Sequence, residues 1–145
     1  GYGVSRMSDG PSDDAPSVKI ALIQGSIDTH VVPEEGSFQK TWSQYAGLSA
    51  EAATQNSDLD LVVWPESMWP DPVFESEPNL PPPPDWDGTT EEFEAKKAEM
   101  IAKYKGTMSQ FARSLDASVL LGAGVNNETA DGWEHYNSAL HVSRG

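Results

Sequence analysis

The sequence predicts an α/β fold, in which helices and strands alternate around a largely parallel sheet. Three short apolar runs, 18–24, 59–64 and 117–125, are typical of buried strands, and two longer segments with helical periodicity separate them. A turn over 126–132 and a fourth strand over 133–142 follow. Because this alternation is typical of strands joined by right-handed crossovers, we expect the element order β-α-β-α-β-β.

The two expected helices each have an apolar stripe and a start signal. The first helix opens at Ser37, a residue type that suits an N-cap, and the second follows 89–92 (TTEE), which fits a capping box. Stripes of this kind pack in the core of a domain. The first stripe contains Phe38, Trp42, Tyr45, Ser49, Ala52 and Ala53. The second contains Phe93, Met100, Ile101, Tyr104, Met108, Phe111, Ala112 and Leu115.

Length and composition indicate one domain with a flexible start. The chain has 145 residues, 37% of them hydrophobic, which is enough for one core. Residues 1–17 have no hydrophobic period and are expected to be a flexible lead-in, and 18–145 form the domain. A Pro-rich loop at about 69–89 either covers a site or is a surface insertion. The chain has neither an initiator methionine nor a signal peptide, and it stops directly after a strand, so we expect a piece of a longer protein.

The charge and the missing cysteines exclude several functions. With a net charge of −14 and only nine Lys and Arg, the chain is not expected to bind nucleic acid or an anionic membrane surface. The absence of cysteine excludes a thiol nucleophile and a Cys-based zinc site within the chain. Neither the three histidines nor the acidic segment 85–92 has full metal-ligand spacing, so we predict no metal and no cofactor.

Glu66 is the main candidate for a chemical role. It follows the expected strand 59–64 and Pro65, and ligands of layered α/β folds bind at the carboxyl ends of strands. Trp64 and Trp69 flank it in the sequence. We expect these indole rings to shelter the carboxylate and raise its pKa towards neutrality, as a general base requires. The alternative is a surface glutamate in a loop.

Three short motifs resemble the nitrilase (carbon–nitrogen hydrolase) superfamily, and within it most closely the catalytic domain of apolipoprotein N-acyltransferases. They are 21–27 (ALIQGSI), 64–67 (WPES, followed by Pro70 and Asp71) and 136–140 (YNSAL). The resemblance covers roughly 18–145 and corresponds to the N-terminal portion of that domain, with 71–92 fitting poorly. It implies that this chain holds about half of a four-layer α-β-β-α sandwich.

The resemblance also implies a mechanism and site residues. In that family a glutamate, a lysine and a cysteine act together, and only the glutamate, at Glu66, has a counterpart here. The lysine and the cysteine are expected beyond Gly145, so this chain alone should be inactive. The acyl donor would be a phospholipid and the acceptor a lipoprotein N-terminus. Tyr136 and Asn137 are candidate substrate-binding residues, and a purely structural role for both is the alternative.

Three functional hypotheses stay open on the sequence alone. The first is an extracytoplasmic acyltransferase domain of a multi-pass membrane protein. The second is a soluble, cytoplasmic amidase or nitrilase, and the third is a non-catalytic acidic binding module. Family members often have a basic residue and a tryptophan where this chain has 31–35 (VVPEE), which puts the acyl-substrate contacts of that segment in question. Because half of a sandwich leaves a sheet face and edge exposed, we also expect self-association.

Overall fold

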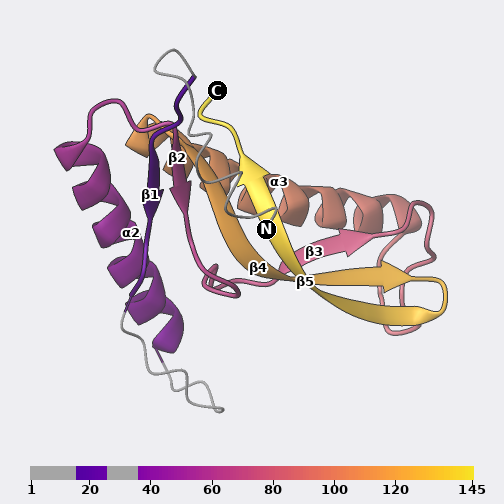
Figure 1. Ribbon diagram of the computed structural model, residues 1–145. Helices are drawn as coiled ribbons and strands as arrows, with labels where there is room; N and C mark the ends of the chain where they lie inside the picture. Colours follow the sequence, from indigo (N-terminus) through magenta and orange to yellow (C-terminus); the bar gives the residue numbers. More distant parts are fainter. Residues whose placement is uncertain (1–15, 26–35) are drawn as a thin grey trace, which may run out of the picture.

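A computed structural model defines residues 16–25 and 36–145 of the chain. These residues form a five-stranded sheet with two helices (Figure 1). The predicted α/β class is therefore confirmed. Most of the expected lead-in 1–17, and the whole of segment 31–35, lie outside the described residues.

The sheet is organised around one long strand, β4 (Ser118–Thr129). Along one edge of β4, β2 (Leu61–Val63) pairs with its first part and β3 (Val73–Ser76) with its last part, both in parallel. β1 (Ile20–Leu22) lies parallel to β2 on the outside. β5 (Gly132–Val142) pairs antiparallel with the other edge of β4, from Val119 to Thr129.

The observed order, β-α-β-β-α-β-β, corrects the sequence prediction in two places. The expected Pro-rich loop contains β3, which is too short to give a clear apolar signal between its flanking prolines. The turn expected over 126–132 is much shorter, because β4 continues to Thr129 and β5 begins at Gly132. Asn126 and Asn127 were placed in a turn because of their polarity, but they pair with β5 in a part of the hairpin that extends beyond the core.

Helix α2 (Ser37–Gln55) and helix α3 (Thr90–Leu115) begin differently. Ser37 was expected to be the N-cap of α2, but Gly36 takes that position with a φ of 82°, which glycine adopts without a steric penalty. The capping box of α3 is confirmed, since Thr89 Oγ1 accepts from the Glu92 N–H and the Glu92 carboxylate accepts from the Thr89 N–H. Within the described ranges, neither helix combines the length and hydropathy that a membrane crossing requires.

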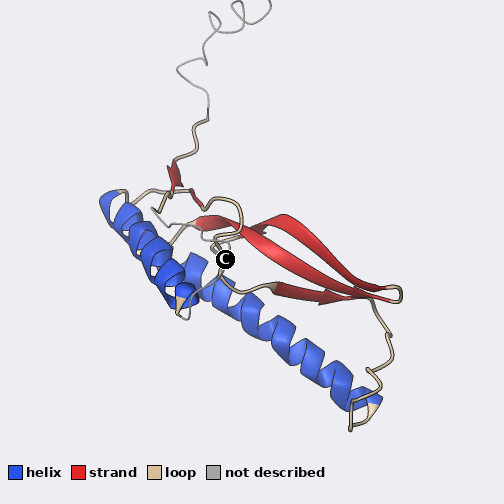
Figure 2. Ribbon diagram, turned by 90° about the horizontal axis from the view of Figure 1, so that it is seen from below, coloured by secondary structure: helices blue, strands red, loops and turns tan. Residues whose placement is uncertain are grey.

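Both helices lie on the same side of the sheet (Figure 2), which we call the helix face. The core lies between them and the sheet, and aromatic rings fill its centre. Trp64 packs against the rings of Tyr45 and Phe111 at centroid distances of 5.2 and 5.3 Å. Trp42 contacts Trp64, Trp69 and Phe111. These five side chains form the aromatic cluster, and most of the apolar stripe of each helix points towards it.

The other side of the sheet, which we call the open face, is not covered by any described element. The apolar run 18–24 was expected to form a buried strand, but β1 is buried on its helix face only. Ile23 on the helix face is buried, whereas Ile20 and Leu22 on the open face are 51% and 77% exposed. An apolar run looks the same whether one or both of its faces are covered, so the sequence did not distinguish the two cases.

Ser49 provides a test of the core. Its hydroxyl is fully buried, donates to the Tyr45 carbonyl at 2.7 Å and accepts from Trp64 Nε1 at 2.9 Å. Replacing it by alanine leaves the buried indole N–H without this acceptor, so Ser49→Ala should lower the free energy of unfolding by about 1–3 kcal/mol. Ser43→Ala, at an exposed position of the same helix, is the control and should change it by less than about 0.5 kcal/mol in urea denaturation. Equal effects of the two variants would contradict the assignment.

The exposed side chains of β1 give the expected self-association a test. A lysine on an edge strand opposes intermolecular pairing, so Ile20→Lys should lower the apparent mass measured by light scattering. Met100→Lys is a matched control, because Met100 is a similarly exposed apolar residue, at 41%, on α3. Light scattering of the unmodified chain should give a mass above that of a monomer; a monomer at all concentrations would refute the prediction.

Candidate active site

A short excursion of the chain places Glu66 beside the sheet. After β2, the Trp64 N–H still donates to the Leu120 carbonyl on β4, at 2.9 Å. The Trp69 N–H then donates to the Gly122 carbonyl, also at 2.9 Å, before the chain continues into β3. Residues 65–68 therefore leave the edge of β4 and return to it, and Glu66 lies within this turn.

Gly122 allows the turn to lie directly against β4. A Cβ atom built on Gly122 would be 2.3 Å from the Pro65 carbonyl oxygen, 2.7 Å from Glu66 Cα and 2.8 Å from the Ser67 nitrogen. No side chain fits in that space. Ser67 itself has a φ of 55°, in the left-handed region that residues other than glycine rarely adopt. The backbone that carries Glu66 is thus held at a fixed position on the open face.

Asn137 on β5 holds the Glu66 carboxylate. Its amide Nδ2 donates to Glu66 Oε1, and its Oδ1 accepts from the Ser67 hydroxyl at 3.3 Å. Because both ends of the amide are bonded to the same turn, the amide fixes the direction of the carboxylate.

The expected shelter of Glu66 between two indole rings is wrong. Trp64 and Trp69 are only 3% and 6% exposed, and both belong to the aromatic cluster on the helix face. Glu66 is exposed on the open face. The sequence placed the three residues together, but strand alternation directs Trp64 to the helix face and the turn after Pro65 directs Glu66 away from it.

The open face has a hollow next to Glu66. Its volume is about 400 Å³, and it lies where β2, β4 and β5 meet. Asn137 and Glu66 supply polar groups on its lining, and Leu120 and Ala139 supply apolar ones. The hollow therefore offers a carboxylate, an amide and an apolar floor to a group that approaches from the open face.

The structure brings Asn137 to Glu66 but does not bring Tyr136 there. Neighbouring strand residues point to opposite faces, so Tyr136 is directed away from the hollow. Its hydroxyl donates to the Glu134 carboxylate at 2.6 Å. This hydrogen bond, together with slight burial and the charge of Glu134, raises the pKa of Tyr136 above its ordinary value. A role of Tyr136 in substrate binding stays a prediction.

Two site residues were missed by the sequence interpretation, and one had a readable signal. Glycine inside a buried strand often marks a close backbone approach, and Gly122 lies within the apolar run 117–125. Nothing in the sequence indicated the left-handed conformation of Ser67.

In the described part of the chain, no group of three or more His, Asp or Glu side chains could hold a metal ion.

These features define a class of protein: an α/β layer that presents one oriented glutamate at the carboxyl end of a parallel strand. Comparison with curated proteins narrows it further. An apolipoprotein N-acyltransferase of Vibrio vulnificus is 26% identical over 142 residues, and one of Geobacter metallireducens is 28% identical over 142 residues. Each match covers 98% of this chain and 22% of the relative. No protein-family model matches the chain.

The resemblance to apolipoprotein N-acyltransferases is thereby confirmed as a partial match. The chain spans about a fifth of the length of these curated relatives. Because each match covers 98% of the chain, the aligned region extends over the β2 exit and the β5 segment.

Gly122→Ala tests whether the close contact positions the site. The added methyl group collides with backbone atoms of the turn, so we expect a loss of about 1–3 kcal/mol in the free energy of unfolding. Gly124→Ala is the matched control, since a Cβ on Gly124 meets nothing within 4 Å. It should cost less than about 1 kcal/mol in the same denaturant titration. Indistinguishable losses would show that the turn does not depend on Gly122.

Proposed function

We propose that this chain is the part of an apolipoprotein N-acyltransferase-type enzyme that supplies its catalytic glutamate. Glu66 is the general base, and the lysine and cysteine that act with it come from residues outside this sequence. The similarity to two apolipoprotein N-acyltransferases over 98% of the chain supports the class. The main structural support is the hydrogen bond by which Asn137 orients the Glu66 carboxylate.

In the proposed reaction, Glu66 transfers protons twice. It first takes the proton of the cysteine thiol, and the thiolate attacks the ester carbonyl of a phospholipid. The lysine stabilises the tetrahedral oxyanion, which collapses to a thioester as the lysophospholipid leaves with the proton from Glu66. The amino group of a lipoprotein then attacks the thioester, and Glu66 takes the amine proton and returns it to the cysteine.

The direction of approach follows from the packing. The aromatic cluster fills the helix face behind β2, so a nucleophile can reach Glu66 only from the open face. The second half of a four-layer sandwich would cover that same face and bring the cysteine to the hollow. It would also remove water from Glu66, which is exposed in the described structure. An extracytoplasmic position on a multi-pass membrane protein belongs to this proposal.

A cytoplasmic amidase or nitrilase that hydrolyses a C–N bond would use the same glutamate, with water as the final acceptor. The two curated relatives, both named as acyltransferases, favour the first assignment. A non-catalytic acidic binding module would need neither the oriented carboxylate nor the hollow beside it.

Replacing the glutamate tests the proposal in the complete gene product that contains this chain. Glu66→Gln keeps the size and the hydrogen-bond geometry but removes the base, so acyl transfer should fall by about 10²–10⁴-fold. Glu51→Gln, on the exposed side of α2, is the control and should keep the original rate. Transfer from a phospholipid to a lipoprotein-derived peptide would be followed by mass spectrometry. An unchanged rate for Glu66→Gln would refute the role of Glu66.

The same preparation separates the hypotheses. An amidase would release ammonia from simple amides without needing the peptide acceptor, and Glu66→Gln would abolish that release instead. If the complete protein contains no lysine and cysteine after Gly145 and catalyses neither reaction, the binding module becomes the better assignment.

A further inference from the structure

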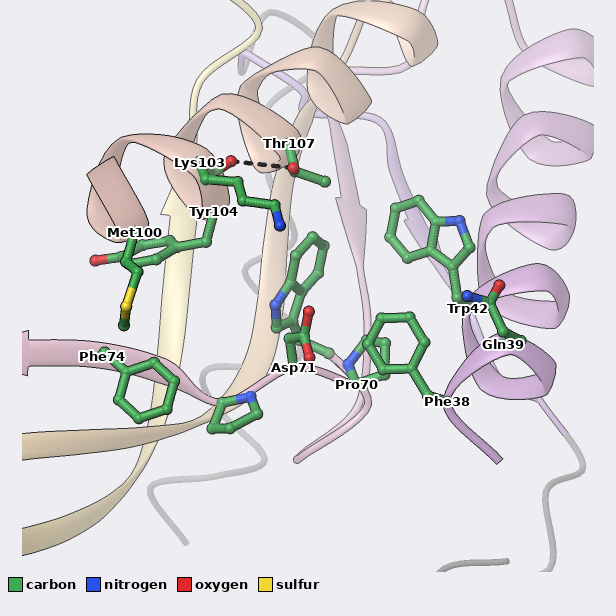
Figure 3. A pocket seen from close by; sticks show the side chains of 12 residues that line it. Phe38, Gln39, Trp42, Pro70, Asp71, Phe74, Met100, Lys103, Tyr104 and Thr107 are labelled. Carbon is green, nitrogen blue, oxygen red and sulfur yellow. Dashed lines mark hydrogen bonds between the residues drawn. The ribbon is translucent and has the colours of Figure 1, made fainter. Parts of the chain in front are cut away.

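A second cavity lies on the helix face, separated from Glu66 by the sheet. Its volume is about 420 Å³, and it lies between α2, α3 and the segment that leads into β3 (Figure 3). This volume is within the range of small-molecule sites in proteins. Aromatic rings form much of its wall, among them those of Phe38, Trp42, Phe74 and Tyr104. Such a wall suits an aromatic ligand, because rings prefer offset or edge-to-face contacts with one another.

Two side chains of opposite charge line this cavity from different walls. Figure 3 shows the Lys103 ammonium group extending from α3 towards the centre of the cavity, and the Asp71 carboxylate reaching it from the segment before β3. Both residues are exposed, so a ligand in the cavity can contact their charged groups directly. The cavity therefore combines an aromatic wall with one accessible positive group and one accessible negative group.

Within the described residues, neither of these two charged groups is paired, either with the other or with a third group. The ion pairs of these residues are those of Lys19 with Asp58, Lys96 with Glu99 and Lys97 with Glu94. A ligand that carries one negative and one positive group could therefore pair with Lys103 and Asp71 at the same time. A ligand with a single charge would be attracted by one of them and repelled by the other.

The cavity wall beside Lys103 has limited contact with water. Tyr104, which also lines the cavity, is half-buried, and burial, together with the nearby charge of Glu75, raises the pKa of its hydroxyl. Ion pairs are stronger where water is partly excluded. The pairs that a ligand forms here should therefore lie at the upper end of the range for surface ion pairs, at about fivefold in affinity for each charge.

We propose that this cavity binds a small zwitterion with an aromatic body, the chemical class to which the free aromatic amino acids belong. The ring of the ligand packs against the aromatic wall, its carboxylate pairs with Lys103 and its ammonium group pairs with Asp71. This site is independent of the proposed acyltransferase function, because it lies on the opposite face of the sheet and shares no lining residue with the hollow at Glu66.

The test uses ligands that share one phenylethyl body and differ in charge. At neutral pH L-phenylalanine carries both charged groups, phenethylamine lacks the carboxylate, and hydrocinnamate lacks the ammonium group. The ¹⁵N-labelled full chain is titrated with each ligand, and the backbone amide resonances of Asp71, Lys103 and Thr107 are followed by NMR. Phenylalanine should bind with a dissociation constant on the order of 1 mM, and about fivefold more tightly than either singly charged ligand.

Removing each charge of the wall should remove the matching preference. Lys103→Met keeps a long side chain without the charge, so in this variant the carboxylate of the ligand gains nothing, and phenylalanine should bind no more tightly than phenethylamine. In Asp71→Asn the ammonium group of the ligand gains nothing, and phenylalanine should bind no more tightly than hydrocinnamate.

Lys105→Met and Asp85→Asn are the matched controls, because both residues are exposed and neither lines the cavity. Both variants should keep the fivefold preference for phenylalanine. The proposal is wrong if phenylalanine produces no saturable shift in the unmodified chain, or if a singly charged ligand binds there as tightly as phenylalanine, whether or not the variants fold. It is also wrong if Lys103→Met or Asp71→Asn folds and retains the preference that it should lose.

Discussion

The contact between the backbone of the 65–68 turn and Gly122 fixes how the chain passes from β2 to β3 along the edge of β4. Before the turn, the Trp64 N–H donates to the Leu120 carbonyl and extends the pairing of β2 with β4. After the turn, the Trp69 N–H donates to the Gly122 carbonyl. Any side chain at Gly122 would force the turn outwards and disturb the register of both β2 and β3. Because register decides which side chains face the core, this one contact links the position of Glu66 to the packing of the aromatic cluster.

The same turn separates two faces of the sheet, one buried and aromatic and the other exposed and polar. Trp64 and Trp69 enter the helix face, where indole and phenyl rings pack at centroid distances between 5.2 and 6.3 Å. Glu66, between them in the sequence, emerges on the open face with Ser67 and Asn137. The packed aromatic cluster on the helix face holds the backbone of the turn in place. An exposed carboxylate such as that of Glu66 is well oriented only if its backbone cannot move.

The features predictable from the sequence were those with a local signal. Apolar strands, the α3 capping box and the place of Glu66 after a strand all follow from patterns of a few residues. The strand β3 and the full length of the β4–β5 hairpin were missed, because their stability comes from pairing along β4 and not from their own composition. The prediction that two indole rings shelter Glu66 was wrong for a similar reason. The direction of the Glu66 side chain depends on the contact of its turn with Gly122, some 56 positions later in the chain.

The exposure of Glu66 and the exposure of Ile20 and Leu22 have a common cause, which is the uncovered open face. A segment that covers this face would bury apolar side chains worth about 1.5–3 kcal/mol each, and it would also desolvate the carboxylate, at a cost that the Asn137 hydrogen bond reduces. The favourable burial therefore offsets the unfavourable desolvation. In the proposed enzyme, the segment that completes the sandwich would therefore also enclose Glu66 and its Asn137 hydrogen bond on the open face.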